Sequence, residues 1–176
     1  MERHRALWKL LLASGRVPSS IVEVAPLNVR VFAEPMTRRH PGCRYLSVDK
    51  WPRGNPHDQR DVGFADRFCD LCTLDGHLPW KADLLLMQHV LEEVPDYRAG
   101  LRAIRNVLQE DAAAYLEIPA RADLLAHRSQ PPDRFGNVWL FSEPQMRREM
   151  EELFASVTLV PYDEGGQKGA VFVCST

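Results

Sequence analysis

A histidine and two glutamates stand in the segment QHVLEEVPD, residues 88–96, directly after an apolar stretch of the chain. A histidine with an ordinary pKa of about 6.5 can accept a proton at neutral pH, so His89 is a candidate general base. The same side chain could instead line a binding site or cap the loop through a backbone hydrogen bond. Glu92 is suited to bracing this loop or the positive N-terminus of the helix that follows.

Two cysteines in the segment FCDLC, Cys69 and Cys72, have the spacing of a metal-binding or redox pair. A structural zinc site needs two more ligands, and the sequence has no second pair of this kind. A redox pair opens a helix, whereas this segment closes a short strand-like run. We therefore expect no metal site, and we expect the cysteines to be free thiols.

Short apolar runs that alternate with helical patterns must position these residues. An apolar stripe with spacings of three and four indicates a helix over residues 97–108. A second helix begins after Ser142, which stands three residues before Gln145 as in a capping box. The expected strands are residues 21–24, 44–48, 67–69, 83–88, 114–118, 156–160 and 170–175.

This alternation predicts an α/β fold with a mostly parallel seven-stranded sheet and helices on both faces. Only nine residues, PYDEGGQKG, join the last two strands, so these strands should form an antiparallel C-terminal hairpin. Two long segments with little regular pattern, residues 50–66 and 120–141, each follow the end of a strand. Open α/β sheets bind ligands at the carboxyl ends of their strands, so we expect the binding site there.

The composition limits the partners of the chain, which has 176 residues and a formal net charge of -2. This balance gives no reason to expect nucleic acid, and we interpret the arginine pairs at 38–39 and 147–148 as solvated surface. No apolar run reaches the roughly 20 residues of a membrane span. The basic, leucine-rich start mimics a signal peptide, but Lys9 interrupts its apolar run and no cleavage site follows. We expect a cytoplasmic protein with no membrane partner.

The chain resembles the class I S-adenosylmethionine-dependent methyltransferases of the type 11-like superfamily. Such enzymes often carry a segment like SHVLEHVPD after the fourth strand, then a helix that ends in RVLKPGG and a fifth strand. The corresponding segments here are QHVLEEVPD and NVLQEDAAAYLEIP. The resemblance implies a single Rossmann-like domain over residues 1–176. Its parts would be an N-terminal helix at 1–19, a cofactor-binding core at 20–119, and an acceptor-side loop, helix and hairpin at 120–176.

The resemblance implies roles for polar residues at the strand ends. Asp49 would accept hydrogen bonds from both ribose hydroxyls of S-adenosylmethionine, because a carboxylate offers two acceptor oxygens. The alternative is that Asp49 caps the next turn. Asp70 would lie beside the adenine amino group, with Leu71 against the adenine ring. The implied cofactor-binding residues are Glu23, Ala25, Pro26, Asn28, Asp49, Lys50, Asp70, Leu71, Gln88 and His89.

Two glycine turns of the family are absent from this sequence. Ala25 and Pro26 follow the first strand where the family has glycines, and QEDAAA replaces the glycine turn after the helix of residues 97–108. A left-handed backbone costs an ordinary residue about 1–2 kcal/mol, whereas Asn28 could tolerate it. We expect the helix of residues 97–108 to lack a left-handed cap.

The segment PPDRFGNVWLFSE matches the part of related methyltransferases that covers the acceptor pocket. An arginine and an aromatic ring there could bind a planar or anionic acceptor. The alternative is that Phe135 and Trp139 pack into the core. Methyl transfer needs alignment more than acid–base help, and a base is required only for a hydroxyl or a protonated amine. The implied acceptor-side residues are Glu92, Arg134, Phe135 and Asn137.

The sequence therefore predicts methyl transfer from S-adenosylmethionine to a small-molecule or peptidyl acceptor, with His89 as the candidate catalytic residue. The alternative is a degenerate methyltransferase-like subunit that binds or regulates a protein partner, which the two missing glycine turns favour. A nicotinamide-dependent oxidoreductase would use Asp49 similarly, but no G-x-G-x-x-G follows the first strand. The sequence does not identify the acceptor.

Overall fold

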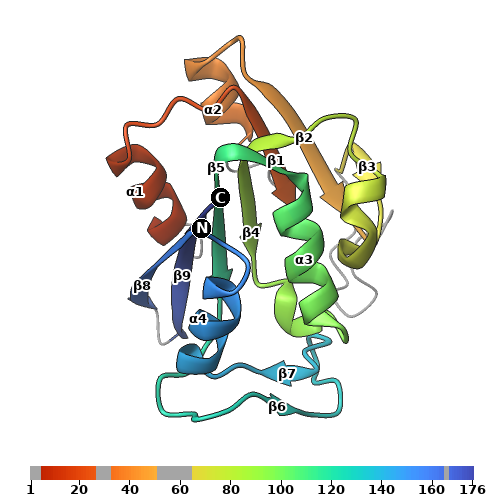
Figure 1. Ribbon diagram of the computed structural model, residues 1–176, viewed down its shortest axis with the longest axis vertical. Helices are drawn as coiled ribbons and strands as arrows, with labels where there is room; N and C mark the ends of the chain where they lie inside the picture. Colours follow the sequence, from red (N-terminus) through yellow and green to blue (C-terminus); the bar gives the residue numbers. More distant parts are fainter. Residues whose placement is uncertain (1–4, 27–32, 51–64, 165–166) are drawn as a thin grey trace.

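A computed structural model describes residues 5–26, 33–50, 65–164 and 167–176. Its centre is one sheet of seven strands (Figure 1). Neighbouring strands among the first five in this order run parallel, whereas β9 is antiparallel to β5 and β8 is antiparallel to β9. The predicted mostly parallel sheet with a C-terminal hairpin is confirmed. The strands are, in sheet order, β3 (Arg67–Phe68), β2 (Arg44–Asp49), β1 (Ser20–Val24), β4 (Ala82–Gln88), β5 (Leu108–Ile118), β9 (Gln167–Ser175) and β8 (Ser156–Glu164).

Helices cover both faces of this sheet, as the alternating pattern predicts. One face carries α1 (Arg5–Ala13) and α2 (Ala33–Arg39). The other face carries α3 (Tyr97–Val107), α4 (Glu143–Glu151) and the short 3-10 helices η2 (Leu71–Gly76) and η3 (Leu91–Glu93). A separate two-stranded sheet, β6 (Arg128–Ser129) and β7 (Trp139–Leu140), lies beyond the carboxyl ends of the parallel strands, at the bottom of Figure 1.

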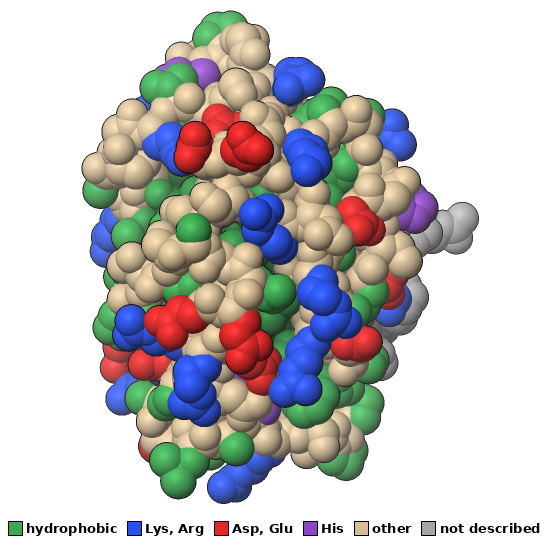
Figure 2. Space-filling model, viewed as in Figure 1, with side chains coloured by type: hydrophobic (Ala, Val, Ile, Leu, Met, Phe, Trp, Pro, Cys, Tyr) green, Lys and Arg blue, Asp and Glu red, His purple; other side chains and the backbone are tan. Residues whose placement is uncertain are grey.

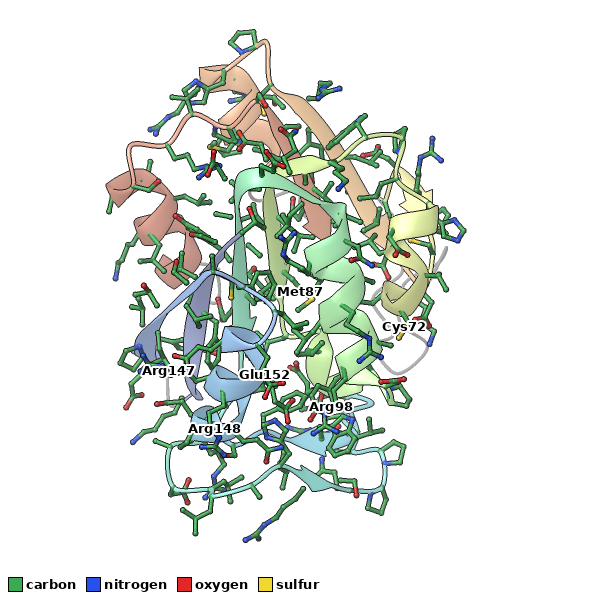
Figure 3. All side chains as sticks on the ribbon, in the orientation of Figure 1. Cys72, Met87, Arg98, Arg147, Arg148 and Glu152 are labelled. Carbon is green, nitrogen blue, oxygen red and sulfur yellow. The ribbon has the colours of Figure 1, made fainter. Side chains whose placement is uncertain are left out.

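The central strand β4 shows why the chain folds into these layers. Leu84 and Leu86 pack with the helices α1 and α2, whereas Leu85 and Met87 pack with α3, and all four side chains are buried. Figure 3 shows Met87 behind α3. An apolar run buried on both faces is typical of a parallel strand, and each of these side chains contributes roughly 1.5–3 kcal/mol of burial free energy.

The two long helices on the same face of the sheet begin at side-chain caps. The Asp96 carboxylate accepts a hydrogen bond from the backbone N–H of Ala99 at 3.0 Å, which starts α3. The Ser142 hydroxyl accepts one from the N–H of Gln145 at 3.3 Å, which starts α4 and confirms the predicted cap. The Gln145 side chain does not complete the capping box. It accepts a hydrogen bond from the N–H of His127 instead, at 2.8 Å.

An ion pair joins these two helices at the surface. The Arg98 guanidinium on α3 lies 2.8 Å from the Glu149 carboxylate on α4 (Figure 3). Arg147 and Arg148 lie on the exposed side of α4, as predicted. Figure 2 shows basic and acidic side chains interspersed on this face of the molecule.

Two residues with left-handed backbone stand where the glycines are missing. Ala25, directly after β1, has φ 51°, and Asp111 has φ 58°. The end of α3 itself has no left-handed cap, because Leu108 caps it with an extended φ of -81°. The expectation for this helix end is therefore confirmed. The left-handed turn comes at Asp111 instead, where the pairing of β5 with β4 shifts register, and aspartate adopts this conformation more readily than most residues.

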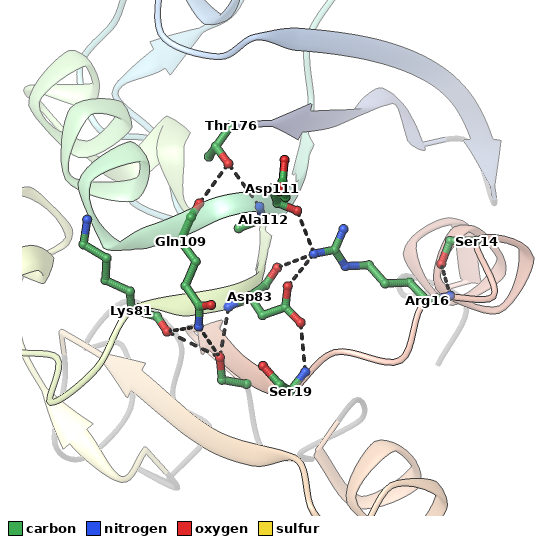
Figure 4. Close-up of polar contacts among 10 residues, drawn as sticks. Ser14, Arg16, Ser19, Lys81, Asp83, Gln109, Asp111, Ala112 and Thr176 are labelled. Carbon is green, nitrogen blue, oxygen red and sulfur yellow. Dashed lines mark hydrogen bonds and ion pairs between the residues drawn. The ribbon is translucent and has the colours of Figure 1, made fainter.

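The amino-terminal edge of the sheet is fastened by one arginine (Figure 4). The Arg16 guanidinium donates hydrogen bonds to the Asp83 carboxylate and backbone carbonyl, and to the backbone carbonyl of Asp111 at 3.0 Å. The other oxygen of the Asp83 carboxylate accepts a hydrogen bond from the N–H of Ser19 at 2.8 Å. These contacts join the segment before β1 to the starts of β4 and β5. We call this set the Arg16 anchor.

Candidate functional site

The polar strand ends of the sequence analysis lie along one edge of the sheet. The parallel register pairs Val24 of β1 with Val48 of β2 and with Met87 of β4, so these three strands end side by side. It also pairs Gln88 with Glu117 of β5. The carboxyl ends of four parallel strands therefore meet at this edge, where open α/β sheets bind ligands.

His89 is held between two buried carboxylates at this edge. Its Nδ1 lies 3.2 Å from Glu92 Oε1, and its Nε2 lies 3.0 Å from Glu117 Oε1. The Tyr162 hydroxyl of β8 is also 3.2 Å from Nε2. The backbone of His89 is left-handed, with φ 51°, and its N–H donates to the carbonyl of Glu117 at 3.0 Å. The imidazole is thus fixed by contacts from three elements.

These contacts determine the charge of the imidazole. Burial acts to lower the pKa of His89, but the hydrogen bonds and charges of Glu117 and Glu92 outweigh it and raise the pKa to about 9. Both ring nitrogens then donate, and His89 is an imidazolium at neutral pH. An imidazolium has no lone pair with which to accept a proton, so this arrangement favours holding the site together over acting as a base in the free protein.

Glu117 and Tyr162 are two residues that the sequence analysis missed. Glu117 is almost fully buried, and its second oxygen accepts a hydrogen bond from Gln88 Nε2 at 2.7 Å. Gln88, a predicted site residue, therefore acts on the same carboxylate as His89. A glutamate near the end of the apolar run AYLEI was a usable signal, because a buried carboxylate needs partners. Tyr162 gave no such signal, because its contact depends on the pairing of β8 with the rest of the sheet.

The turn after β1 combines a buried acid with the left-handed alanine. Glu23 is 5% exposed and accepts a hydrogen bond from the Tyr45 hydroxyl of the neighbouring strand. The N–H of Ala25 donates to the carbonyl of Val48 at 2.8 Å, which ties the turn to β2. Pro26 is buried next to it. The predicted site residue Asn28 lies outside the described residues.

The structure brings together two predicted residues from the ends of β2 and β3. Lys50 Nζ lies 3.0 Å from an oxygen of the Asp70 carboxylate, and the other oxygen accepts a hydrogen bond from the N–H of Cys72 at 2.9 Å. The Cys72 hydrogen bond and, after it, Lys50 lower the pKa of Asp70 against the opposing effect of burial. Leu71 is buried against α3, where its side chain faces Gly100. Asp70 thus caps η2 as well as facing the end of β2.

Glu93 is a further acidic residue at this edge. It is half-buried, and burial raises the pKa of its carboxyl to about 7, with additional contributions from the negative charges of Glu92, Asp49 and Asp133 against the opposing charge of His89. These three charges belong to η3, to the end of β2 and to the segment after β5. The sequence analysis assigned no role to Glu93.

The segment between β5 and α4 is more regular than the sequence suggests. The Asp133 carboxylate accepts hydrogen bonds from the N–H groups of Phe135 and Asn137, at 2.8 and 3.0 Å. Phe135 is 46% exposed, with the Arg134 guanidinium 4.5 Å from its ring centre. Trp139 instead packs against the core and donates to the carbonyl of Val94 at 3.1 Å. Packing into the core thus describes Trp139 but not Phe135.

Among the described residues, no group of three or more histidine, cysteine or acidic side chains is arranged to hold a metal ion. All four cysteines are free thiols, as predicted. Within the same part of the chain, no helix is long and apolar enough to cross a membrane.

A family model described as a methyltransferase domain matches residues 2–153. The match spans most of the chain, including every strand end that forms the site. The chain belongs to the methyltransferase domain family. Among curated proteins, no sequence is similar enough to count as a match.

Solved structures share the fold of this methyltransferase domain at low sequence identity. The 1,6-didemethyltoxoflavin N1-methyltransferase of Burkholderia thailandensis, solved with S-adenosylhomocysteine, has a TM-score of 0.68 at 18% identity, over 99% of this chain and 78% of that one. The N-methyltransferase NodS of Bradyrhizobium japonicum, also solved with S-adenosylhomocysteine, has a TM-score of 0.62 at 18% identity, over 99% and 86%.

A putative O-methyltransferase from Nostoc punctiforme has a TM-score of 0.68 at 14% identity. This methyltransferase domain covers 100% of its own length in that comparison but only 57% of the other chain. It likewise covers 55% and 48% of two further methyltransferase structures. The shared part is the Rossmann-like sheet with its antiparallel C-terminal strands, which confirms the predicted fold.

Proposed function

We propose that this methyltransferase domain binds S-adenosylmethionine at the carboxyl edge of its sheet and transfers the methyl group to a small-molecule or peptidyl acceptor. The observation that carries the proposal is the left-handed turn at Ala25 beside the end of β2. This backbone conformation is retained although the sequence lacks the glycine that adopts it easily. The family match and the two relatives solved with S-adenosylhomocysteine support the same cofactor.

The residues at this edge fit the cofactor. Asp49 ends β2 with a half-buried carboxylate, the group that can accept hydrogen bonds from two ribose hydroxyls. Asp70 and Lys50 would flank the adenine side, and the turn at Ala25 would pass under the methionine part. Bound there, S-adenosylmethionine supplies a methyl group on a positively charged sulfur. The acidic side chains around the site favour a ligand of that charge.

His89 takes a positioning role in this proposal. The imidazolium bridges Glu92 of η3 and Glu117 of β5, and it accepts no proton while both carboxylates hold it. Positioning matters here because methyl transfer is an in-line displacement whose rate depends on alignment. By fixing the loop after β4 against β5, His89 would hold the residues that face the acceptor at a constant position relative to those that face the cofactor.

The degenerate, non-catalytic alternative rests on the two absent glycine turns. Ala25 and Asp111 both adopt left-handed backbone in their place, so the loss of glycine has not removed the conformation. The structure therefore gives the alternative less support than the sequence does.

Isothermal titration of the purified protein with S-adenosylmethionine and with S-adenosylhomocysteine tests the proposal. We expect saturable binding of both, with a dissociation constant in the micromolar range. The matched variants are Asp49→Asn, which removes a charge from the site, and Asp123→Asn, which removes an exposed charge outside it. Circular dichroism establishes that each protein is folded. If folded wild-type protein binds neither compound at millimolar concentration, the proposal is refuted and the degenerate, non-catalytic alternative is favoured.

A further inference from the structure

His127 holds the segment between β5 and α4 against the start of α4. Its side chain is only 3% exposed. The imidazole Nδ1 accepts a hydrogen bond from the backbone N–H of Ser142 at 2.9 Å, and the backbone N–H of His127 donates to Gln145 Oε1 at 2.8 Å. Ser142 also caps α4, and its hydroxyl donates to the carbonyl of Leu124 at 2.7 Å. The imidazole therefore joins the first part of this segment to the residue at which α4 begins.

The hydrogen bond from Ser142 determines where the imidazole carries its proton. A backbone N–H can only donate, so Nδ1 must offer a lone pair, and a neutral ring then carries its proton on Nε2. Nε2 is buried and has no hydrogen-bond partner among the described residues. It lies 3.8 Å from Glu149 Oε2, which is also buried and has no partner in the same part of the chain. A donor and an acceptor thus lie just beyond hydrogen-bonding distance.

The two oxygens of the Glu149 carboxylate differ in their partners. Oε1 accepts hydrogen bonds from the Arg98 guanidinium at 2.8 Å, from the Gln145 side chain at 2.7 Å and from the Tyr97 hydroxyl at 3.2 Å. These contacts hold the carboxylate between α3 and α4. Native proteins rarely leave a buried carboxylate oxygen without a donor, because its desolvation is costly. A shift of about 1 Å would bring Oε2 within hydrogen-bonding distance of the His127 ring.

Protonation would exchange one partner of His127 for another. In an imidazolium both ring nitrogens donate, so Nδ1 can no longer accept the N–H of Ser142. Two donors would then face each other across 2.9 Å, and this hydrogen bond would be lost. The positive ring would at the same time attract the Glu149 carboxylate, which lies on the side of Nε2. Neutral His127 thus binds Ser142, whereas charged His127 would bind Glu149.

The surroundings of His127 favour the neutral ring while the segment is in place. Burial lowers the pKa of His127, the negative charge of Glu149 opposes this effect, and the positive charges of Arg98 and Arg148 lower the pKa further. The Tyr97 ring contacts the imidazole edge-on, with 5.4 Å between the ring centres. An imidazole released to solvent would return to its ordinary pKa of about 6.5. The released form therefore binds the proton more strongly than the form in this structure.

We propose that His127 is a pH-sensitive latch, which holds the segment between β5 and α4 closed as a neutral imidazole and releases it on protonation. The strands β6 and β7 of this segment lie beyond the carboxyl ends of the parallel strands (Figure 1). The segment also contacts the loop after β4, because Val138 donates to the carbonyl of Glu92 and Trp139 donates to that of Val94. Its release would expose the edge that carries the candidate site. The inference holds whether or not the protein transfers methyl groups.

Hydrogen exchange of the wild-type protein tests the latch without any ligand. The probes are the backbone N–H groups of Gln130 and Val138, which donate to the carbonyls of Val138 and Glu92. The opening constant should rise as the pH falls below about 6.5, by up to about tenfold per pH unit until the pKa of the closed form is reached. After correction for intrinsic exchange rates, we expect protection to be roughly 3–10-fold lower at about pH 5.5 than at about pH 7.5. Unchanged or higher protection at the lower pH would overturn the inference.

His127→Asn removes the titrating group but keeps an acceptor for Ser142, because the asparagine side-chain oxygen can take the place of Nδ1. We expect its protection factors at the two pH values to agree within about twofold. The matched control is His77→Asn, which removes an exposed histidine outside the segment and should keep the wild-type fall. An equal fall in His127→Asn and in the wild-type protein would assign the pH dependence to another group and overturn the latch.

NMR of the imidazole nitrogens supplies a second measurement, which needs only the wild-type protein. Long-range proton–nitrogen spectra at neutral pH should show His127 as a neutral ring with its proton on Nε2. The ring should titrate at a lower pH than an ordinary histidine, and the loss of protection at Gln130 and Val138 should accompany its protonation. An imidazolium at neutral pH, or a proton on Nδ1 of the neutral ring, would contradict the acceptor role toward Ser142 and overturn the inference.

Discussion

Replacing His89 by asparagine removes the cation between two buried carboxylates. Asparagine tolerates a left-handed backbone, so the substitution keeps the φ of 51° while deleting both contacts of the ring. The Glu92 and Glu117 side chains are only 3% and 1% exposed, which leaves their charges uncompensated. Removing one partner of a buried ion pair costs about 3–5 kcal/mol. We expect that loss in the free energy of unfolding, measured by urea denaturation at pH 7.

The same imidazolium gives the wild-type protein a pH dependence with a definite sign. Its pKa is raised to about 9 in the folded protein, against about 6.5 in an unfolded chain. The stabilisation is therefore complete below about pH 6.5 and is lost as the pH rises through 9, with an upper limit of about 3 kcal/mol. A double variant, His89→Asn with Glu117→Gln, should lack this decline and should be more stable than His89→Asn alone.

His77→Asn is the matched control, because His77 is an exposed histidine that ends η2. It should change the free energy of unfolding by less than about 0.5 kcal/mol. A loss below about 1 kcal/mol in His89→Asn, or a double variant less stable than the single one, would refute the ion-pair reasoning.

Three further predictions concern the backbone and the cofactor site. Ala25→Gly relieves a left-handed strain of about 1–2 kcal/mol but adds freedom to the unfolded chain, so thermal melting should show a net gain of up to about 1 kcal/mol; a loss would contradict the strain. Asp49→Ala should weaken cofactor binding about 10–100-fold in titration, and unchanged affinity in folded protein would remove Asp49 from the site. Gly169→Ala would place a Cβ 2.6 Å from the Tyr162 hydroxyl and 2.7 Å from the Ile118 carbonyl oxygen, so urea denaturation should show a loss of about 1–3 kcal/mol.

The sequence predicts the layers of this fold well, because the spacing of apolar residues determines which segments form strands and which form helices. A continuous apolar run such as the one ending at Met87 is typical of a strand buried on both faces, and the stripe of residues 97–108 indicates a helix that packs on one side. The hairpin followed from the nine residues that join its strands. These are local properties, and the seven strands of the central sheet and the helices α3 and α4 reflect them, whereas the short strands β6 and β7 have no such pattern.

The site was harder to predict because its contacts are long-range. Glu117 is 28 residues from His89 and Tyr162 is 73 residues from it, and neither distance leaves a pattern in the sequence. The candidacy of His89 as a base assumed an ordinary pKa, which the two carboxylates change. The missing glycines were a poor guide to the backbone conformation after β1, because residue type predicts only a preference for certain φ values. The tertiary structure holds Ala25 in a conformation that alanine rarely adopts.

The Arg16 anchor has a consequence for engineering. It ties the segment before β1 to the starts of β4 and β5, at the edge opposite the carboxyl ends of the parallel strands. The contacts of the Arg16 anchor involve no residue of the carboxyl edge, so a change in a loop there leaves these contacts in place. A chimera that takes the segment between β5 and α4 from another methyltransferase would keep every contact of the Arg16 anchor, but it would have to replace the core contacts that Trp139 makes.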